Sequence, residues 1–287
     1  MNNKTQNENE SVKSMVELSI RKKFHKELFS NFAKAINQYQ LIEPDDKIAV
    51  CISGGKDSML MAKLFQELKR HNKFNFELGF LVMNPGYADK NLELIKENAA
   101  KLDIPIKIFD TDIFANVEHI EKSPCYVCAR MRRGFLYAKA KELGFNKIAL
   151  GHHFDDVIET ILMGMLYGAQ IQTMVPKVHS KNFSGMELIR PMYLIREKDI
   201  IHWKEYNGLE FLQCACKFTA DSKDKIVESK RAETKKLIAS LAKTDPQIEN
   251  NIFKSVENVN LSTIMGYKDT SGKKVGFLDY YNSYFEE

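Results

Sequence analysis

A short glycine-rich segment follows an apolar stretch near the start of the chain. After the strand-like residues 48–52, it consists of Ser53, Gly54, Gly55, Lys56, Asp57 and Ser58. Adjacent glycines let backbone N–H groups converge on an oxyanion, and the positive end of a following helix points to the same place. Lys56 adds a mobile positive charge, and Asp57 stands where it can share a magnesium ion with bound phosphates. The spacing differs from that of the Walker loop, and we expect a phosphate-binding loop, with an ordinary strand-to-helix turn as the alternative.

A second polar segment occupies an equivalent place further along the chain. It follows the strand-like residues 147–150 and consists of Gly151, His152, His153, Phe154, Asp155 and Asp156. Because the carboxyl ends of parallel strands meet at one edge of a sheet, we expect this segment beside the glycine-rich loop. Asp156 is the candidate for binding magnesium or transferring a proton. The simpler alternative is that one aspartate caps the next helix and that the histidines are ordinary loop residues.

Four of the five cysteines form two close pairs. Cys125 and Cys128 have metal-ligand spacing at the start of a basic helix, and Cys214 and Cys216 form a second pair. A helix N-terminus with arginines nearby favours the thiolate. Four cysteines would make a closed zinc site, whereas three of them holding an iron–sulfur cluster would leave one iron open. The short spacing of the second pair counts modestly against zinc, but the residues alone leave the metal open. Cys51, inside an apolar strand, is expected to be a small buried hydrophobe.

Length and composition set broad limits on the class of protein. The 287 residues are enough to bury a sizeable core, and the net charge of +4 is too small to establish a nucleic-acid partner by itself. No apolar run approaches the ~20 residues that cross a bilayer, and the first residues are polar. We therefore expect a cytoplasmic protein without a membrane partner, in which the cysteines serve a metal or catalysis rather than disulfides.

Apolar stretches alternate with helical patterns along most of the chain. Strands are expected at residues 47–52, 77–83, 104–109, 147–150 and 187–190, and helices at 19–39, 155–167, 196–207 and 221–243. Apolar strands linked by helices predict an α/β fold, an open and mostly parallel sheet with helices on both faces. The expected organisation is a disordered lead over 1–15, a basic N-terminal helix over 16–45, the sheet domain with the cysteine cluster over 46–217, and a helical C-terminal extension over 218–287.

The three motifs occur in a recognisable order. The SGGKDS loop, the C-x-x-C pair with its Arg-rich helix, and the Gly-His-His-x-Asp-Asp turn resemble the tRNA 2-thiocytidine synthetase family of PP-loop ATPases. The similarity covers roughly residues 20–220. It includes the segments Ile189-Arg190-Pro191 and Arg196-Glu197-Lys198-Asp199. It implies the adenine nucleotide alpha hydrolase-like fold of the PP-loop superfamily.

The resemblance also implies an activity, that of an ATP-dependent tRNA sulfurtransferase. ATP and Mg2+ would be held by Ser53–Ser58 together with Gly151 and His152. The residues implied to be catalytic are Lys56, Asp57 and Asp156. The C2 oxygen of a tRNA pyrimidine, the anticodon-loop cytidine 32, would be adenylated, and sulfur would then displace AMP. A single-stranded anticodon loop lets the base be turned out at low cost.

In the family, three cysteines hold a 4Fe-4S cluster whose open iron accepts the sulfur. The resemblance carries this role to Cys125, Cys128 and Cys216. The family's later pair is also C-x-x-C, whereas this chain has C-x-C, so Cys214 is the alternate third ligand. The sulfur donor would be a cysteine desulfurase or sulfide, and a homodimer is expected by analogy with related enzymes.

Basic residues near the cysteines are the candidates for contacting tRNA. They are Arg130, Arg132 and Arg133, joined by the basic N-terminal residues Arg21, Lys22, Lys23 and Lys26. Such runs bind phosphates, but they also solvate ordinary helices. Two other functions stay open: a PP-loop tRNA-modifying ligase that needs no cluster, and a zinc-stabilised RNA-binding protein without turnover.

Overall fold

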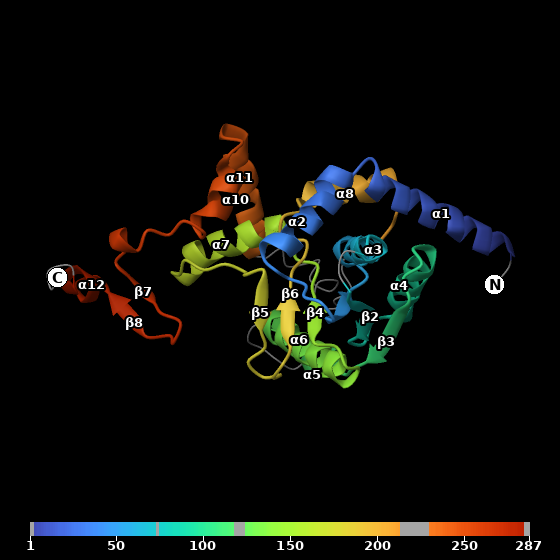
Figure 1. Cartoon of the computed structure of the whole chain (residues 1–287), viewed down its shortest axis with the longest axis horizontal. Coiled ribbons are helices and arrows are strands. Elements are labelled where there is room, and N and C mark those ends of the chain that lie inside the picture. Colours follow the sequence, from blue (N-terminus) through green and yellow to red (C-terminus); the bar gives the residue numbers. More distant parts are fainter. Residues whose placement is uncertain (1–2, 73–74, 118–123, 213–229, 284–287) are drawn as a thin grey trace, which may run out of the picture. The chain divides into compact units, whose positions relative to one another are not determined.

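The computed structural model describes residues 3–72, 75–117, 124–212 and 230–283 (Figure 1). The chain divides into two compact units, one formed by residues 1–157 and 174–228, the other by residues 158–173 and 229–287. Helix α7 (Phe154–Gly168) begins in the first unit and continues into the second. In the described residues, no helix is both long enough and apolar enough to cross a bilayer.

The described part of the first unit is built on a six-stranded sheet with the order β3-β2-β1-β4-β6-β5. The strands are β1 (Lys47–Ile52), β2 (Glu77–Asn84), β3 (Ile106–Asp110), β4 (Lys147–Ala149), β5 (Lys177–His179) and β6 (Glu187–Ile189). All neighbours pair in parallel except β5, which runs antiparallel to β6 at the edge. The mostly parallel sheet is confirmed. Strand β5 was not expected, because Val178 is its only apolar residue.

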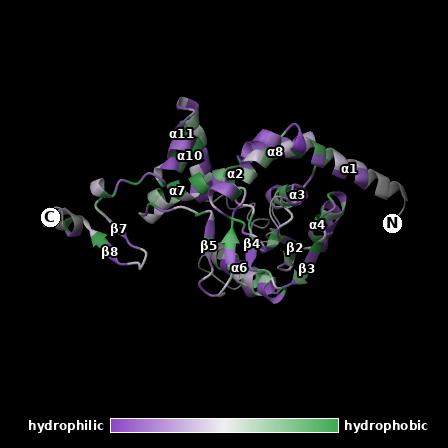
Figure 2. Cartoon of the chain, viewed as in Figure 1, coloured by the Kyte–Doolittle hydropathy of each residue, from purple (hydrophilic) through white to green (hydrophobic). Residues whose placement is uncertain are grey.

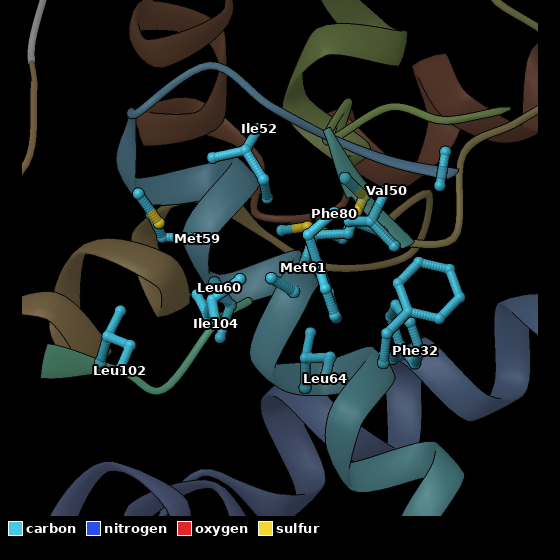
Figure 3. Packing of buried hydrophobic residues seen from close by; sticks show 14 of the residues in the cluster. Phe32, Val50, Ile52, Met59, Leu60, Met61, Leu64, Phe80, Leu102 and Ile104 are labelled. Carbon is cyan, nitrogen blue, oxygen red and sulfur yellow. The ribbon is translucent and has the colours of Figure 1, made fainter. Parts of the chain in front are cut away.

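Helices cover both faces of this sheet. They include α3 (Lys56–Arg70), α4 (Asp89–Lys101), α5 (Ile113–Val117), α6 (Pro124–Glu142) and α8 (Glu197–Tyr206). Along β1, Val50 packs into the main core with helix residues such as Phe32 and Leu64, while the next residue, Cys51, packs on the other face with Tyr137 of α6. Figure 3 shows Phe32, Val50 and Leu64 gathered in the main core with Phe80 of β2. This alternation explains why β1 is apolar throughout.

The N-terminal segment differs from the expected disordered lead and single basic helix. It forms α1 (Asn3–Arg21), the π-helix η1 (His25–Ser30) and α2 (Asn31–Gln38). Helix α1 buries Val16 and Ile20 in the main core, Val12 packs against this core, and Lys13 pairs with Asp103. Packing against the main core thus stabilises this helix, and composition alone does not reveal that packing.

The second unit is smaller and mostly helical. Besides the rest of α7 it contains α10 (Lys230–Thr244), α11 (Ile248–Ser255), the short η3 (Leu261–Thr263), a hairpin of β7 (Gly266–Lys268) and β8 (Lys274–Gly276), and α12 (Phe277–Ser283). Arg231 of α10 binds Glu159 of α7, with 2.8 Å between Nη1 and Oε2. The helical extension contains a hairpin that the sequence analysis did not expect, and the expected boundary at 217/218 lies outside the described residues. In Figure 2, α10 carries both hydrophilic and hydrophobic colours.

Candidate functional site

The glycine-rich loop joins the end of β1 to the start of α3. Gly54 has a φ of +87°, and a Cβ placed there would lie 2.5 Å from Cγ1 of Ile95, so both the backbone angle and the space require glycine. The Ser58 hydroxyl donates to the Gly55 carbonyl at 3.0 Å and accepts from the Ser53 backbone N–H at 3.2 Å. The loop therefore holds its shape through its own serines while the N-terminus of α3 faces the site.

Lys56 lies between two carboxylates. Its Nζ is 3.1 Å from Oδ1 of Asp57 and 3.2 Å from Oε1 of Glu197. Burial is the largest single influence and acts to lower the pKa of Lys56, but the charges and hydrogen bonds of Asp57 and Glu197 outweigh it and raise the pKa above its ordinary value. Lys56 is therefore a positive charge at neutral pH, held in place before any phosphate binds.

Glu197 is a site residue that the sequence analysis missed. It is the first residue of α8, and its backbone N–H donates to Oδ2 of Asp155 at 2.7 Å. Arg196 reaches the same carboxylate, with 3.3 Å between Nη2 and Oδ1. Acidic residues are common in the first turn of a helix, so the residue type of Glu197 did not mark it as part of the site. The only indication in the sequence was its place in the family-like segment 196–199. Asp155 thus ties α8 to the Gly151–Asp156 segment.

The Gly151–Asp156 segment touches the loop directly. A Cβ on Gly151 would lie 3.3 Å from the backbone nitrogen of Ser58, so glycine permits the close approach. His153 is buried, and its Nε2 lies 3.5 Å from Oδ2 of Asp156 and 3.9 Å from Oδ1 of Asp57. The same Asp156 oxygen accepts from the His153 backbone N–H at 3.0 Å, as in a capping box. Asp156 therefore caps α7, and capping is also compatible with a role in the site.

These segments share one cavity of about 420 Å³ at the carboxyl edge of the sheet. Among the predicted site residues, its lining contains Ser53, Asp57, Ser58, Gly151, His152, Asp156, Arg132 and Arg133. The arginines come from α6, while the others follow β1 and β4. The structure thus brings the predicted phosphate loop, the Asp156 segment and the basic helix to one place.

Comparison with known proteins identifies the family. The sequence profile of the PP-loop domain matches residues 25–217. The tRNA-cytidine(32) 2-sulfurtransferase of Coxiella burnetii (strain RSA 493) is 34% identical over 255 residues, which cover 86% of this chain and 95% of that protein. The chain belongs to the tRNA-cytidine(32) 2-sulfurtransferase family. Another family member, from Paraburkholderia phymatum, is 34% identical over 252 residues, covering 86% of this chain and 72% of that protein.

A solved structure shares the PP-loop fold of this tRNA-cytidine(32) 2-sulfurtransferase family member. It is the U34-tRNA thiolase NcsA from Methanococcus maripaludis with its 4Fe-4S cluster, at a TM-score of 0.64 and 23% identity. The alignment covers 82% of this chain and 78% of that chain. At this identity the likeness shows the fold, which agrees with the expected PP-loop architecture.

The cysteines of this family member are partly placed by the structure. Helix α6 begins at Pro124, a favourable first residue, so Cys125 and Cys128 belong to its first turns. Cys128 is buried, and Arg132, one helical turn further, lines the cavity. The side chain of Cys125, and the predicted ligands Cys214 and Cys216, lie outside the described residues. The ligand set therefore stays a prediction.

The segment before the second cysteine pair is attached to the PP-loop. The backbone N–H of Leu212 donates to the carbonyl of Gly54 at 3.2 Å. The Leu212 carbonyl lies 3.6 Å from the position of a Cβ on Gly55. In the sequence, Cys214 follows Leu212 by two residues. The segment that leads to the second cysteine pair is therefore hydrogen-bonded to the PP-loop at Leu212.

The predicted tRNA-binding residues differ in their surroundings. Arg130 is exposed, Arg133 is exposed at the cavity, and Arg132 donates to the Tyr87 hydroxyl at 2.8 Å. In the N-terminal segment, Arg21 is bound to carboxylates of the protein itself, with 2.8 Å between its Nε and Oε2 of Glu67. Lys23 lies over the ring of Tyr206 at 3.8 Å. Arg21 and Lys23 therefore have partners within the protein that the sequence did not show, and their contact with tRNA stays a prediction.

Cys51 also lines the cavity. Its side chain is buried, and burial raises the pKa of its thiol to about 12. The thiol is therefore neutral at physiological pH, which makes it a poor nucleophile and metal ligand. The expectation that Cys51 is a small buried hydrophobe is confirmed.

Proposed function

We propose that this protein is an ATP-dependent tRNA sulfurtransferase that replaces the C2 oxygen of cytidine 32 with sulfur. The observation that carries the proposal is the cavity that joins the PP-loop to Asp156 and to the α6 face next to Cys128. The names of the relatives support the choice of cytidine 32. Residues 46–217 form the catalytic domain in this proposal, and residues 218–287 form its extension.

The described residues fit ATP with a magnesium ion. The loop supplies backbone N–H groups and a helix N-terminus for phosphate, and Lys56 supplies a positive charge. Asp57 and Asp156 both line the cavity, and carboxylates with phosphate oxygens are the hard ligands that magnesium prefers. We assign these two residues to the ion. Gly151 lets the second segment come close enough to share the same nucleotide.

The reaction has two steps. In the first, the C2 oxygen of the cytidine bonds to the α-phosphorus of ATP, and the bond to the β-phosphate breaks, releasing pyrophosphate. In the second, sulfide bonds to C2 and AMP leaves with the oxygen. Lys56 and the loop N–H groups stabilise the negative charge that develops on the phosphates, which is an electrostatic contribution to the rate. His153 orients Asp156 through the contacts described above.

The cysteines are assigned in this proposal to a cluster that would deliver sulfur. Cys125, Cys128 and Cys216, with Cys214 as the alternate, would hold a 4Fe-4S cluster, which would supply the iron chemistry for sulfur delivery. The start of α6 favours thiolates, and the attachment of Leu212 to the PP-loop supports a second pair close to the ATP site. The thiolase of similar fold is described with such a cluster. The sulfur donor is proposed to be a cysteine desulfurase or sulfide, and the active form a homodimer.

The decisive experiment is anaerobic thiolation of unmodified tRNA. The reconstituted protein is incubated with ATP, Mg2+ and sulfide, and digested tRNA is analysed for 2-thiocytidine by mass spectrometry, with iron, zinc and acid-labile sulfide measured on the same protein. Two alternative outcomes would replace the proposal. ATP-dependent modification without iron would indicate another PP-loop ligase. Stoichiometric zinc without AMP formation would indicate an RNA-binding protein.

A further inference from the structure

Arg132 is a positively charged residue in the wall of the cavity. It is half-buried on α6, and it lines the cavity together with Ala129, Arg133 and Leu136 from the same face of that helix. Within the described residues, its guanidinium makes one hydrogen bond, from Nη2 to the hydroxyl of Tyr87 at 2.8 Å, and no ion pair with a carboxylate. A guanidinium has five N–H donors, so most of its hydrogen-bonding capacity and its charge remain available in the cavity.

Tyr87 is a rigid support for this guanidinium. It is buried in the segment between β2 and α4, and its ring packs edge-on against Phe114 of α5, with 6.0 Å between the ring centroids. Its backbone N–H donates to Oδ1 of Asn84, the last residue of β2, at 2.8 Å. The side-chain amide of Asn84 in turn donates to Oδ1 of Asp110 on β3 at 2.8 Å. Both the backbone and the ring of Tyr87 are therefore fixed to the sheet domain, and its hydroxyl has a defined place.

The support is uncharged, which distinguishes Arg132 from Lys56. Lys56 pairs with the carboxylates of Asp57 and Glu197. The Tyr87 hydroxyl accepts a hydrogen bond and orients the guanidinium, but it does not cancel the charge as a carboxylate would. A half-buried charge is only partly solvated, so an anionic ligand in the cavity would supply the compensation that such a charge needs.

The segment of Tyr87 and the PP-loop leave the sheet at the same edge. Tyr87 follows β2, which pairs in parallel with β1, and the PP-loop follows β1. Met83, near the end of β2, lines the same cavity as Ser53 and Ser58 of the loop. Arg132 therefore faces, from the wall formed by α6, the space into which the PP-loop also opens. The two molecules that enter this space in the proposed reaction, ATP and tRNA, both carry phosphate.

We infer that Tyr87 is a positioning residue that fixes Arg132 as a binding subsite for a phosphate group in this cavity. A guanidinium binds phosphate oxygens through two parallel hydrogen bonds, so its orientation determines whether both bonds form. The inference rests on the proposed function, which supplies ATP and tRNA as the two sources of phosphate, and binding measurements separate the two. It gives a role to Tyr87, which the sequence analysis did not select, and it gives Arg132 one defined ligand group.

The test is a double-mutant cycle with Tyr87→Phe, Arg132→Gln and the two substitutions combined. Tyr193→Phe is the control, because Tyr193 is also a buried tyrosine that packs edge-on against an aromatic ring, Tyr39, and it is not one of the described residues that line the cavity. For each variant, the affinity for a non-hydrolysable ATP analogue is measured by calorimetry, and the affinity for unmodified tRNA by equilibrium binding. Thermal unfolding establishes that each variant is folded.

We expect Tyr87→Phe to weaken binding of one of the two ligands by about fivefold, the usual effect of one neutral hydrogen bond, and Arg132→Gln to weaken it by about tenfold or more. The double variant should match Arg132→Gln, because the Tyr87 hydroxyl acts only through the guanidinium. Tyr193→Phe should bind both ligands as wild type does. A loss confined to the ATP analogue assigns the phosphate to ATP, and a loss confined to tRNA assigns it to the tRNA backbone.

Three results would overturn the inference. They are unchanged binding of both ligands by Arg132→Gln, an equal loss of both ligands, which indicates a distorted cavity, and additive effects of the two substitutions, which would mean that Tyr87 does not act through Arg132. Wild-type protein that binds the ATP analogue but not tRNA would refute the proposed function, and the ATP measurements would still test the subsite. Binding of neither ligand by wild-type protein would overturn both.

Discussion

The Nζ of Lys56 in the PP-loop lies 3.2 Å from Oε1 of Glu197, a residue 141 positions later in the chain. The contact connects the first turn of α3 to the first turn of α8. Asp155 holds the same turn of α8 through the Glu197 backbone N–H. The lysine that should meet ATP is thus held by a carboxylate that is itself fixed to the second motif.

Replacing Glu197 with glutamine should loosen Lys56 without removing its charge. We expect Glu197→Gln to be folded and to lower kcat/KM for ATP by about tenfold, because the lysine loses one of its two carboxylate partners. Steady-state kinetics of AMP formation measures this. Glu205→Gln, at an exposed position of the same helix, is the control and should behave as wild type. Equal activity of the two variants would show that Glu197 does not position Lys56.

Removing the charge of Lys56 should lower activity more than the Glu197→Gln substitution does. Lys56→Ala is expected to lower the rate of AMP formation by about 100-fold or more, the usual cost of losing one group that stabilises transition-state charge. Iron and sulfide content should not change, since Lys56 lies on α3 and the cysteines of the C-x-x-C pair on α6. Loss of both the cluster and AMP formation would instead indicate a damaged fold.

The two buried cysteines of the cavity region should behave differently. Cys128→Ala is expected to abolish iron binding and thiolation while binding of an ATP analogue persists. Cys51→Ala should keep the iron, because its thiol is neutral and packs as a hydrophobe. Metal analysis and the visible spectrum of anaerobically purified protein decide this. Full thiolation by Cys128→Ala would refute the cluster role.

Glu67 should make the stability of the fold depend on acid pH. Burial, the largest influence, acts to raise its pKa, but Arg70 and Arg21 outweigh it and lower the pKa from 4.5 to about 2. A carboxyl with a depressed pKa contributes stability above its unfolded value, near pH 4.5, and that contribution is lost as the pH falls toward about 2.

We therefore expect Glu67→Gln to lower the free energy of unfolding by about 2 kcal/mol at pH 7. The difference from wild type should be smaller at pH 3. Urea unfolding at both pH values measures this. Glu77→Gln, whose side chain is 66% exposed and pairs with Lys47 at the surface, should change stability by less than about 0.5 kcal/mol. A Glu67→Gln effect that does not vary with pH would contradict the depressed pKa.

The sheet and the motifs at its edge follow from the order of residues along the chain. Apolar residues on both sides of β1 require two covered faces, and polar residues directly after β1 and β4 must lie together because parallel strands end at one edge. The order of the motifs also identified the family correctly. These features depend on periods and spacings along the chain, which are visible without coordinates.

Which distant residues complete the site depends on the three-dimensional fold. Glu197 follows an ordinary local pattern, the start of a helix, so its residue type carries no signal of its partner Lys56. The basic run around Arg21 likewise gave no sign that its carboxylate partner Glu67 lies on α3. The physical reason is the same in each case: the state of a charge depends on burial and on neighbours from other elements, and neither is encoded in local sequence.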